Sequence, residues 1–297
     1  MAKITIIGAG ELGRALGSVL RQHQLAYWDK DETRLRVVVS GELPDLPESM
    51  IEADFVFLCL SSWNLKEALA FLQPYWPRSA VAVIWSKGFD GPTKKLPHEI
   101  ASKLLPPKVG LVSAGGAMLA EEIGAGRQGA CLLVGEDAPK VAELFAGTKI
   151  SVRVSDDLDG LAWAGVLKNV YALGLGLAEG LGYSLAERAI VFGRMQIEAG
   201  RLIKILGGQR ETWLAPEITA DFLITSFSSD SLNHQIGFEL GRFGPAESTG
   251  KISEGLMSLP PLLERLGSDQ FKFPLLLKLA DIFCRQSSPA SFQEIFD

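Results

Sequence analysis

The sequence predicts a two-domain α/β protein, with an N-terminal doubly wound sheet followed by an all-α domain. Three observations predict it. Apolar strand-like runs alternate with helical patterns in the first half, a glycine-rich stretch follows the first run, and strand-like runs stop after about residue 157. Runs that are apolar throughout are typical of strands covered on both faces by helices. We therefore predict a dinucleotide-binding domain over 1–156 and a helical substrate domain over 157–297.

The elements of the first domain follow from their periodicity. The stretch ELGRALGSVLRQ (11–22) places apolar residues at helical spacing, and 64–76 does the same with Asn64 as the predicted N-cap. Strand-like runs occupy 3–8, 25–29, 54–61, 80–86, 109–114, 130–135 and 150–155.

The second domain consists of helical patterns joined by short connections. One pattern contains the most apolar run, at 166–182, but this run includes Lys168, Asn169 and Glu179, so we expect a buried helix and no membrane span. The first strand begins by Lys3, which leaves no room for a leader, and a cytoplasmic protein is expected. Helices are predicted at 160–181, 184–206, 217–226, 230–241, 252–266 and 273–285, with connections at 207–213 and 242–250.

The composition excludes several classes of function. The net charge of −6 and the absence of a basic block argue against nucleic-acid binding, although a local pocket can still bind a small anion. Cys59, Cys131 and Cys284 are far apart among apolar neighbours, so we expect buried thiols and neither a disulfide nor a zinc site. The histidines lack ligand spacing, and no metal is expected. The apolar helical domain is compatible with a homodimer.

The stretch ITIIGAGELGRALGSVL (4–20) predicts a Rossmann-type dinucleotide site. A strand precedes the G-x-G-x-x-G string and a helix follows it. Gly8 permits the tight turn, Gly10 lets the backbone approach a diphosphate, and Gly13 lets the helix lie close to the sheet. The positive end of that helix then faces the diphosphate. The alternative is a glycine-rich turn that binds no ligand.

Asp29 ends the second strand-like run about twenty residues after the motif begins, where a carboxylate can bind ribose hydroxyls. A carboxylate repels a 2′-phosphate, so NAD is favoured over NADP. Lys30, Arg34 and Arg36 follow closely and could neutralise such a phosphate. The alternative for Asp29 is a solvated strand end.

Two lysines stand in unusual surroundings. Lys87 directly follows an apolar strand-like run, at the sheet edge where ligands gather in parallel α/β folds. Lys168 lies in a helix that is otherwise almost free of charge. A cation beside a carbonyl that accepts a hydride stabilises the alkoxide and can supply its proton. The alternative for Lys168 is an aliphatic stem that reaches the surface with its ammonium in water.

The residues resemble the NAD(P)-dependent glycerol-3-phosphate dehydrogenase family over nearly the whole chain. LKNVYALGLGLAEGLGYSLAERAIVFGRMQIEAGRL (167–202) is similar to its helical-domain signature, and GAGELGRAL (8–16) to its cofactor loop. Shorter matches, in order, are WSKGFD (85–90), AEEIGAG (120–126), ADFLIT (220–225), SEGL (253–256) and FPLLLKLADIF (273–283).

The resemblance implies the reversible reduction of dihydroxyacetone phosphate to glycerol 3-phosphate, a phosphorylated small-molecule substrate. It implies that Lys168 is the general acid/base, with Lys87 and Asp221 as further catalytic residues. Thr225, Asn233 and Asn169 would bind substrate, and the cofactor residues would be Gly8, Gly10, Glu11, Leu12, Gly13, Asp29, Lys87 and Glu254. Without the resemblance, Asp221 could be a helix N-terminal charge, Thr225 and Asn233 could cap or line helices, and Glu254 could be solvated.

Departures from the family pattern bear on the substrate. Leu232 stands at the first arginine of the family's S-R-N-R segment, the phosphate anchor, and His234 stands at the second. Leucine cannot bind a phosphate. Substitute anchors could come from His234, Arg242, Lys251 or the helix start near 229–231, although His234 is interpreted as a polar surface side chain. Leu12 and Ala117 replace the family's tryptophan and proline.

Three hypotheses follow for the function of the chain. It could be an active glycerol-3-phosphate dehydrogenase, a related NAD(P)-dependent reductase of another small keto or imine substrate, or a dinucleotide-binding homologue without catalysis. The family motifs and both lysines favour the first, and Leu232 motivates the second. NADH binding without turnover would support the third.

Overall fold

The computed structural model describes residues 1–40, 43, 45–91, 93–244 and 251–296. The chain divides into two compact units, Met1–Ala162 and Trp163–Asp297, which we call the N-terminal unit and the helical unit. The functional division expected after residue 156 stays a prediction. Of the connection expected at 242–250, residues 245–250 lie outside the described residues.

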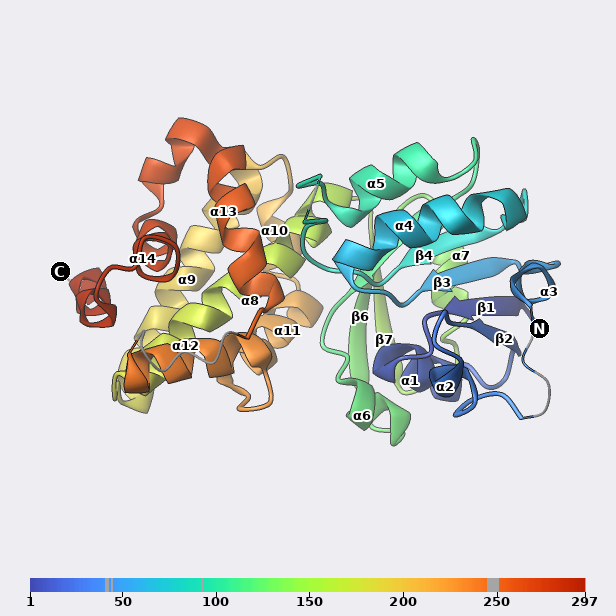
Figure 1. The fold of residues 1–297 in the computed structure, drawn as a ribbon, viewed down its shortest axis with the longest axis horizontal. Coiled ribbons are helices and arrows are strands. Elements are labelled where there is room, and N and C mark those ends of the chain that lie inside the picture. Colours follow the sequence, from blue (N-terminus) through green and yellow to red (C-terminus); the bar gives the residue numbers. More distant parts are fainter. Residues whose placement is uncertain (41–42, 44, 92, 245–250, 297) are drawn as a thin grey trace. The chain divides into compact units, whose positions relative to one another are not determined.

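The described part of the N-terminal unit forms one seven-stranded sheet in the order β2-β1-β3-β4-β5-β6-β7 (Figure 1). The strand β5 pairs antiparallel with β6, and all other neighbours pair parallel. The predicted doubly wound fold class is confirmed, with one antiparallel pair in a mainly parallel sheet. The strands are β1 (Lys3–Ile7), β2 (Gln24–Trp28), β3 (Phe55–Leu58), β4 (Val81–Ile84), β5 (Leu111–Gly115), β6 (Gly129–Val134) and β7 (Ile150–Ser155).

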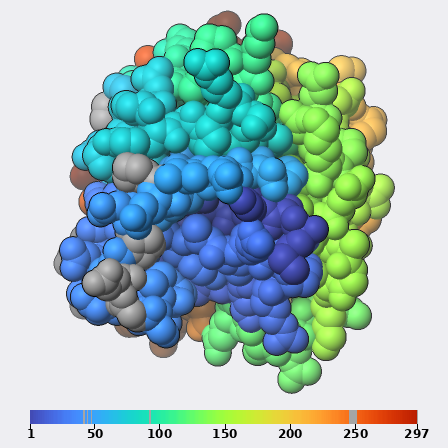
Figure 2. Space-filling model, turned by 90° about the vertical axis from the view of Figure 1, so that its right-hand side faces the viewer, coloured from blue at the N-terminus to red at the C-terminus, as the bar shows by residue number. Residues whose placement is uncertain are grey.

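Helices cover both faces of this sheet and enclose two apolar cores. One core includes residues of α1, α6 and α7, and the other includes residues of α3, α4 and α5. Figure 2 faces this unit, with the blue start of the chain between the cyan to turquoise residues around α4 and α5 and the yellow-green residues around β7. The helices are α1 (Glu11–Val19), α2 (Glu32–Leu35), α3 (Leu46–Met50), α4 (Ser62–Leu72), η1 (Gln73–Tyr75), α5 (Pro97–Leu104), α6 (Ala120–Gly124) and α7 (Ala138–Glu143).

Two local predictions in the N-terminal unit and one in the helical unit are wrong. Ser61, not Asn64, is the N-cap of α4, because Asn64 lies one turn inside and donates its side-chain amide to Ser61 Oγ at 2.8 Å. None of the cysteines forms a disulfide, but only Cys131 is buried, and Cys284 is exposed. Cys59 is half-buried, and Cys284 lies at the C-terminal end of α14.

The described part of the helical unit contains helices and no strand, as the periodicity predicts. A short helix, α10, lies inside the connection predicted at 207–213. The helices are α8 (Leu158–Gly180), whose first residues belong to the N-terminal unit, α9 (Leu185–Ile205), α10 (Arg210–Trp213), α11 (Pro216–Phe227), α12 (Leu232–Phe243), α13 (Glu254–Leu266), η3 (Gly267–Lys272), α14 (Pro274–Phe283) and η4 (Pro289–Phe296).

The helix α8 is the one helix in the described part of the chain that is long and apolar enough to cross a membrane. However, 94% of its most apolar 18-residue window is buried inside the protein. A helix that is apolar on all sides is typical of a buried core element as well as of a membrane span. The apolar character of α8 is therefore explained by its position as a core helix.

The helices α8 and α12 cross with their backbones in near contact. Each contributes a G-x-x-x-G pair, Gly176 and Gly180 on α8 and Gly237 and Gly241 on α12. A Cβ atom added to any of the four glycines would crowd against a backbone carbonyl of the other helix. Small residues at such spacing let helices approach closely. This crossing brings the start of α12 beside the middle of α8, where the candidate residues of the helical unit lie.

Candidate functional site

The glycine loop lies between β1 and α1, as predicted. Gly8 has a φ of +101°, which an L side chain rarely adopts, and an added Cβ would lie 2.5 Å from the carbonyl oxygen of Cys59. A Cβ on Gly13 would overlap the carbonyl oxygen of Gly8, so α1 can sit this close to the loop only with glycine there. Gly10 is the N-cap of α1, and a Cβ on it would meet no atom within 4 Å.

This geometry fits the diphosphate of a dinucleotide. The open space beside Gly10 lets a ligand approach the backbone, and the helix that begins there places its positive end and its first N–H groups at the loop. Glu11 begins the helix and is exposed, whereas Leu12 is half-buried and packs on the core. The contact of Glu11 and Leu12 with a cofactor stays a prediction.

Asp29 directly follows β2 and is buried rather than solvated. Its Oδ2 accepts the N–H of Ala9 in the glycine loop at 2.8 Å, and its Oδ1 accepts the N–H of Asp31 at 2.9 Å. The carboxylate therefore holds the loop in place, and its bond to a ribose stays a prediction. Nearby, Arg34 pairs with Asp31 at 3.3 Å and is exposed.

Lys87 lies just beyond the end of β4 and is half-buried. Its Cε would be 3.9 Å from a Cβ added to Gly115, so the lysine stem extends over the end of β5. The preceding Ser86 fixes this turn by donating its hydroxyl to the carbonyl of Leu60 at 2.6 Å. The carboxyl ends of neighbouring parallel strands are where ligands bind in doubly wound folds. The position of Lys87 therefore suits a ligand-binding cation.

Lys168 projects from the apolar helix α8 and is 8% exposed. Its Nζ donates to Asp221 Oδ1 at 2.7 Å and to Thr225 Oγ1 at 3.0 Å. The two partners stand four residues apart on α11 and so face the same way. The alternative in which Lys168 reaches bulk water is wrong. A buried ammonium is held here between a carboxylate and a hydroxyl.

A second set of polar bonds begins at the next residue of α8. Asn169 donates its amide to Glu254 Oε2 at 2.9 Å and accepts at Oδ1 from Asn233 Nδ2 at 3.1 Å. Asn233 Oδ1 in turn accepts the N–H of Gly255 at 2.9 Å. These bonds tie α8, α12 and α13 together, and the solvated alternative for Glu254 is wrong.

The structure thus arranges the candidate residues of the helical unit in two hydrogen-bonded sets that begin at neighbouring positions of α8. We call them the lysine cluster: Lys168, Asn169, Asp221, Thr225, Asn233 and Glu254. They come from α8, α11, α12 and α13. The other candidates, the glycine loop residues with Asp29 and Lys87, belong to the N-terminal unit.

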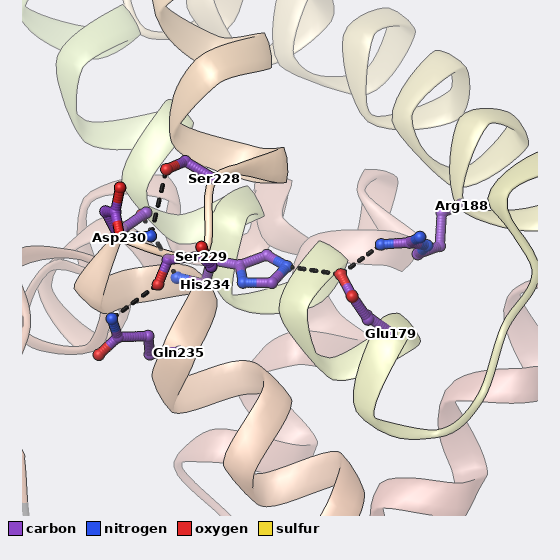
Figure 3. A network of polar contacts seen from close by, with 8 residues as sticks. Glu179, Arg188, Ser228, Ser229, Asp230, His234 and Gln235 are labelled. Atoms are coloured by element: carbon purple, nitrogen blue, oxygen red, sulfur yellow. Dashed lines mark hydrogen bonds and ion pairs between the residues drawn. The ribbon is translucent and has the colours of Figure 1, made fainter. Parts of the chain in front are cut away.

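His234 is directed away from the start of α12 (Figure 3). Its Nε2 lies 3.0 Å from Glu179 Oε2, and the same carboxylate binds Arg188. Its side chain is only 6% exposed, so the interpretation of His234 as a surface residue is wrong. Burial is the main cause that lowers its pKa from 6.5, against the opposing charge of Glu179. Since its Nε2 is already engaged, His234 is a poor phosphate anchor.

The remaining substitute anchors stand in different surroundings. Lys251 pairs with Glu239 at 2.8 Å, and Arg242 is exposed in the last turn of α12. At the start of α12, Ser231 caps the helix by accepting the N–H of His234. Leu232 itself is 40% exposed. An apolar, partly exposed side chain therefore stands one residue before Asn233 of the lysine cluster.

Sequence reasoning missed the residues that hold the cluster in place. The four glycines of the α8–α12 crossing and the Glu179–Arg188–His234 contacts (Figure 3) were not predicted. Gly255 was also missed, although a Cβ there would crowd Asn169 and Asn233. The two G-x-x-x-G pairs were the signal that could have shown the close crossing.

The fold and the site define a class, a dinucleotide-fold protein whose helical unit carries a buried lysine–aspartate pair. Two family models match this chain: the NAD-dependent glycerol-3-phosphate dehydrogenase N-terminus over residues 41–140 and the C-terminus of the same family over 157–294. A glycerol-3-phosphate dehydrogenase (NAD(P)+) of Thiobacillus denitrificans is 30% identical over 282 residues, 86% of this chain and 85% of the relative. The chain therefore belongs to the NAD(P)-dependent glycerol-3-phosphate dehydrogenase family, which confirms the resemblance.

Solved structures share the fold. A glycerol-3-phosphate dehydrogenase of Coxiella burnetii superposes with a TM-score of 0.86 at 23% identity, over 100% of this chain and 99% of that one. A ketopantoate reductase of Ralstonia eutropha superposes with a TM-score of 0.62 at 18% identity, over 98% of this chain and 99% of that one. At such identities these likenesses describe the fold alone.

Proposed function

We propose that the chain catalyses the reversible reduction of dihydroxyacetone phosphate to glycerol 3-phosphate, with Lys168 as the general acid/base. As a family member it is an NAD(P)-dependent oxidoreductase that acts on a CH–OH group, with NAD or NADP as cofactor. The observation that carries the proposal is the buried Lys168 ammonium between Asp221 and Thr225.

Lys168 supplies the proton that the reaction needs. A bound nicotinamide cofactor would supply the hydride for the substrate carbonyl carbon, and the carbonyl oxygen would gain negative charge. An ammonium in a buried site stabilises that charge and donates the proton to the oxygen. In the reverse direction the neutral amine removes the hydroxyl proton. Asp221 favours the ammonium and, together with Thr225, fixes its position.

The other candidate residues bind and orient. Asn169 and Asn233 have amides at the lysine cluster that can also bond substrate hydroxyls. Lys87 serves as the second cation for the substrate oxygen, at the ends of β4 and β5. Glu254, which accepts a hydrogen bond from Asn169, serves as a cofactor contact, and the similarity of SEGL (253–256) to the family motif supports this role.

The glycine loop holds the dinucleotide, and NAD is the preferred form. Gly8, Gly10 and Gly13 leave room for the diphosphate at the start of α1. Asp29 is buried at the loop, and its charge disfavours a 2′-phosphate. Arg34, which could offset that charge, already pairs with Asp31. A homodimer and a cytoplasmic location stay predictions.

The test is a spectrophotometric assay of the purified full chain. NADH should be oxidised on addition of dihydroxyacetone phosphate, and NAD+ reduced on addition of glycerol 3-phosphate. Lys168→Ala should lower kcat by about 10²- to 10⁴-fold, the usual contribution of a general acid, while NADH titration is unchanged. An unchanged rate in this variant would refute the role of Lys168. NADH binding without turnover on any substrate would indicate a non-catalytic homologue.

A second candidate function is the reduction of a related keto or imine substrate without the phosphate. The observation that favours it is Leu232, which stands partly exposed beside Asn233 where the family carries its phosphate anchor. A screen of keto acids and imines with NADH and NADPH separates the two functions. If dihydroxyacetone phosphate is the substrate, Leu232→Arg should lower its KM by about tenfold, since charge-assisted bonds contribute about 1.5–3 kcal/mol. Unchanged kinetics would mean that Leu232 does not determine the substrate.

A further inference from the structure

A cavity lies in the helical unit, where α9, α14 and η4 meet. Its volume is about 430 Å³. Its surface is mostly apolar, because the aliphatic stems of charged side chains line it together with Ile197, Pro274, Leu275 and Ile295. Mostly apolar concave sites of this size, with a few polar groups, are typical of small-molecule binding. No residue of the lysine cluster lines it. The cavity is therefore distinct from the site proposed above and does not depend on it.

Two arginines of α9 stand at this cavity. Arg194 and Arg201 are two helical turns apart, with Ile197 on the same face between them. Both arginines are exposed, and Ile197 is 60% exposed. The three side chains place an apolar surface between two positive charges.

The guanidinium groups of these arginines are positioned by neighbouring carbonyl and ring groups. Arg194 donates to the carbonyl of Ile295 and lies over the ring of Phe296, 5.4 Å from its centroid. Arg201 lies over the ring of Phe273 at 6.0 Å. In the part of the chain that the structure describes, neither makes an ion pair with a carboxylate. Positioned guanidinium groups bind carboxylates and phosphates through paired hydrogen bonds.

The acidic groups of the lining are already engaged. Glu198 accepts the N–H groups of Leu275 at 3.1 Å and Leu276 at 2.8 Å, and the hydroxyl of Tyr171 at 2.9 Å. Burial raises the pKa of Glu198, against the opposing effects of these hydrogen bonds and of the charge of Arg201. Glu294 is paired with Lys278 at 2.6 Å. The lining carries three cationic side chains and two acidic ones, so its net charge is positive, and an anionic group belongs next to the two exposed arginines.

We propose that this cavity binds a small amphipathic anion. Its apolar body packs on Ile197 and Leu275, and its single phosphate or carboxylate lies between Arg194 and Arg201. The size of the cavity limits the body to a short chain or a small ring. The two head groups share the same recognition chemistry, and the experiment below separates them.

Isothermal calorimetry on the full-length protein tests the proposal, with octyl phosphate and octanoate as probes. Each should bind with one site per chain, and the tighter one identifies the preferred head group. Octan-1-ol and inorganic phosphate each lack one half of the ligand and should bind at least about tenfold more weakly. Octylamine, whose charge is repelled, should not bind.

A double variant locates the site. Arg194→Gln with Arg201→Gln should weaken octyl phosphate binding by about tenfold or more, because both charge-assisted contacts are lost. The matched control is Arg285→Gln, an exposed arginine paired with Asp281 outside the cavity, which should leave binding unchanged. Thermal unfolding and NADH binding verify that each variant is folded. If the double variant does not fold, Arg194→Gln alone is used for the same measurement.

Several outcomes would overturn the proposal. One is that neither anionic probe binds at millimolar concentration. Another is that the double variant binds octyl phosphate as tightly as the parent, or that Lys168→Ala abolishes binding while the double variant retains it. The last is that no probe binds and that Ile197→Glu converts a dimer to a monomer, as measured by light scattering. This result would mean that the face around Ile197 is a contact between copies of the chain.

Discussion

The glycine loop depends on its backbone, whereas the lysine cluster depends on its side chains. The loop, at Gly8 to Gly13, works through backbone positions that a side chain would block. The lysine cluster works through side chains that lie between positions 168 and 254 and come from four helices. Binding through a backbone needs a short local motif, whereas an acid/base group needs neighbours that only the packed fold supplies. Substitutions at the two places should therefore damage different steps.

Asp221→Asn should have a larger effect than a change in the glycine loop, and the effect should be on turnover. The substitution keeps the size of the side chain but removes the charge that holds the Lys168 ammonium. We expect kcat to fall by about a hundredfold, within the range for a disturbed general acid, with little change in NADH affinity. Steady-state kinetics and NADH fluorescence titration measure the two effects. A loss of NADH affinity with an unchanged kcat would mean that Asp221 acts in cofactor binding and not in turnover.

Gly10→Ala should damage binding without damaging the fold. An added Cβ meets no protein atom within 4 Å, and the backbone at Gly10 is allowed for alanine, with φ at −69° and ψ at −171°. The methyl group would occupy the space of the diphosphate, so we expect NADH to bind about tenfold or more weakly at an unchanged melting temperature. NADH affinity equal to the parent would show that no diphosphate approaches this backbone.

Gly237→Ala should lower the stability of the helical unit. The new methyl group would overlap the backbone of α8, and overpacking of this kind costs about 1–3 kcal/mol. Gly193→Ala is the matched control, because a Cβ there meets nothing within 4 Å and alanine favours a helix by about 0.5–1 kcal/mol. Urea unfolding should shift in opposite directions for the two variants. A shift in the same direction would contradict the close crossing.

His234→Gln should have the smallest effect, on the pH dependence of stability. Burial lowers the folded-state pKa of His234 below 6.5, even with Glu179 in contact and Arg188 nearby. The unfolded chain then binds more protons between these two pKa values, so stability is full above about pH 6.5 and falls as the pH drops through it. The variant should flatten this slope in urea unfolding between about pH 7.5 and pH 5.5. Equal slopes in both proteins would contradict the assignment.

Much of the fold could be predicted because it depends on local patterns. The continuous apolar runs predicted the strands, and the G-x-G-x-x-G string after the first run predicted the loop at Gly8. Family motifs suggested the members of the lysine cluster, because the sequence shows a lone apolar helix around Lys168 and says nothing of Asp221 beside it.

The features that could not be predicted depend on contacts between distant segments. The reversed direction of β6 and β7 and the burial of His234 are not encoded in local periodicity. Asn64 was expected to cap α4, but the chain enters this helix one turn earlier, at Ser61. In each case the feature depends on a residue or strand that lies outside the short stretch of sequence from which the prediction was made.

The glycine-to-glycine crossing of α8 and α12 has a consequence for protein engineering. Replacing helical glycines with alanine is a common way to raise heat resistance, because it improves helix propensity. Here the same exchange at Gly176, Gly180, Gly237 or Gly241 would push Asn233 away from Asn169. A thermostable version of this protein would have to be sought on the outer turns of α9, at positions such as Gly193, with these four glycines left unchanged.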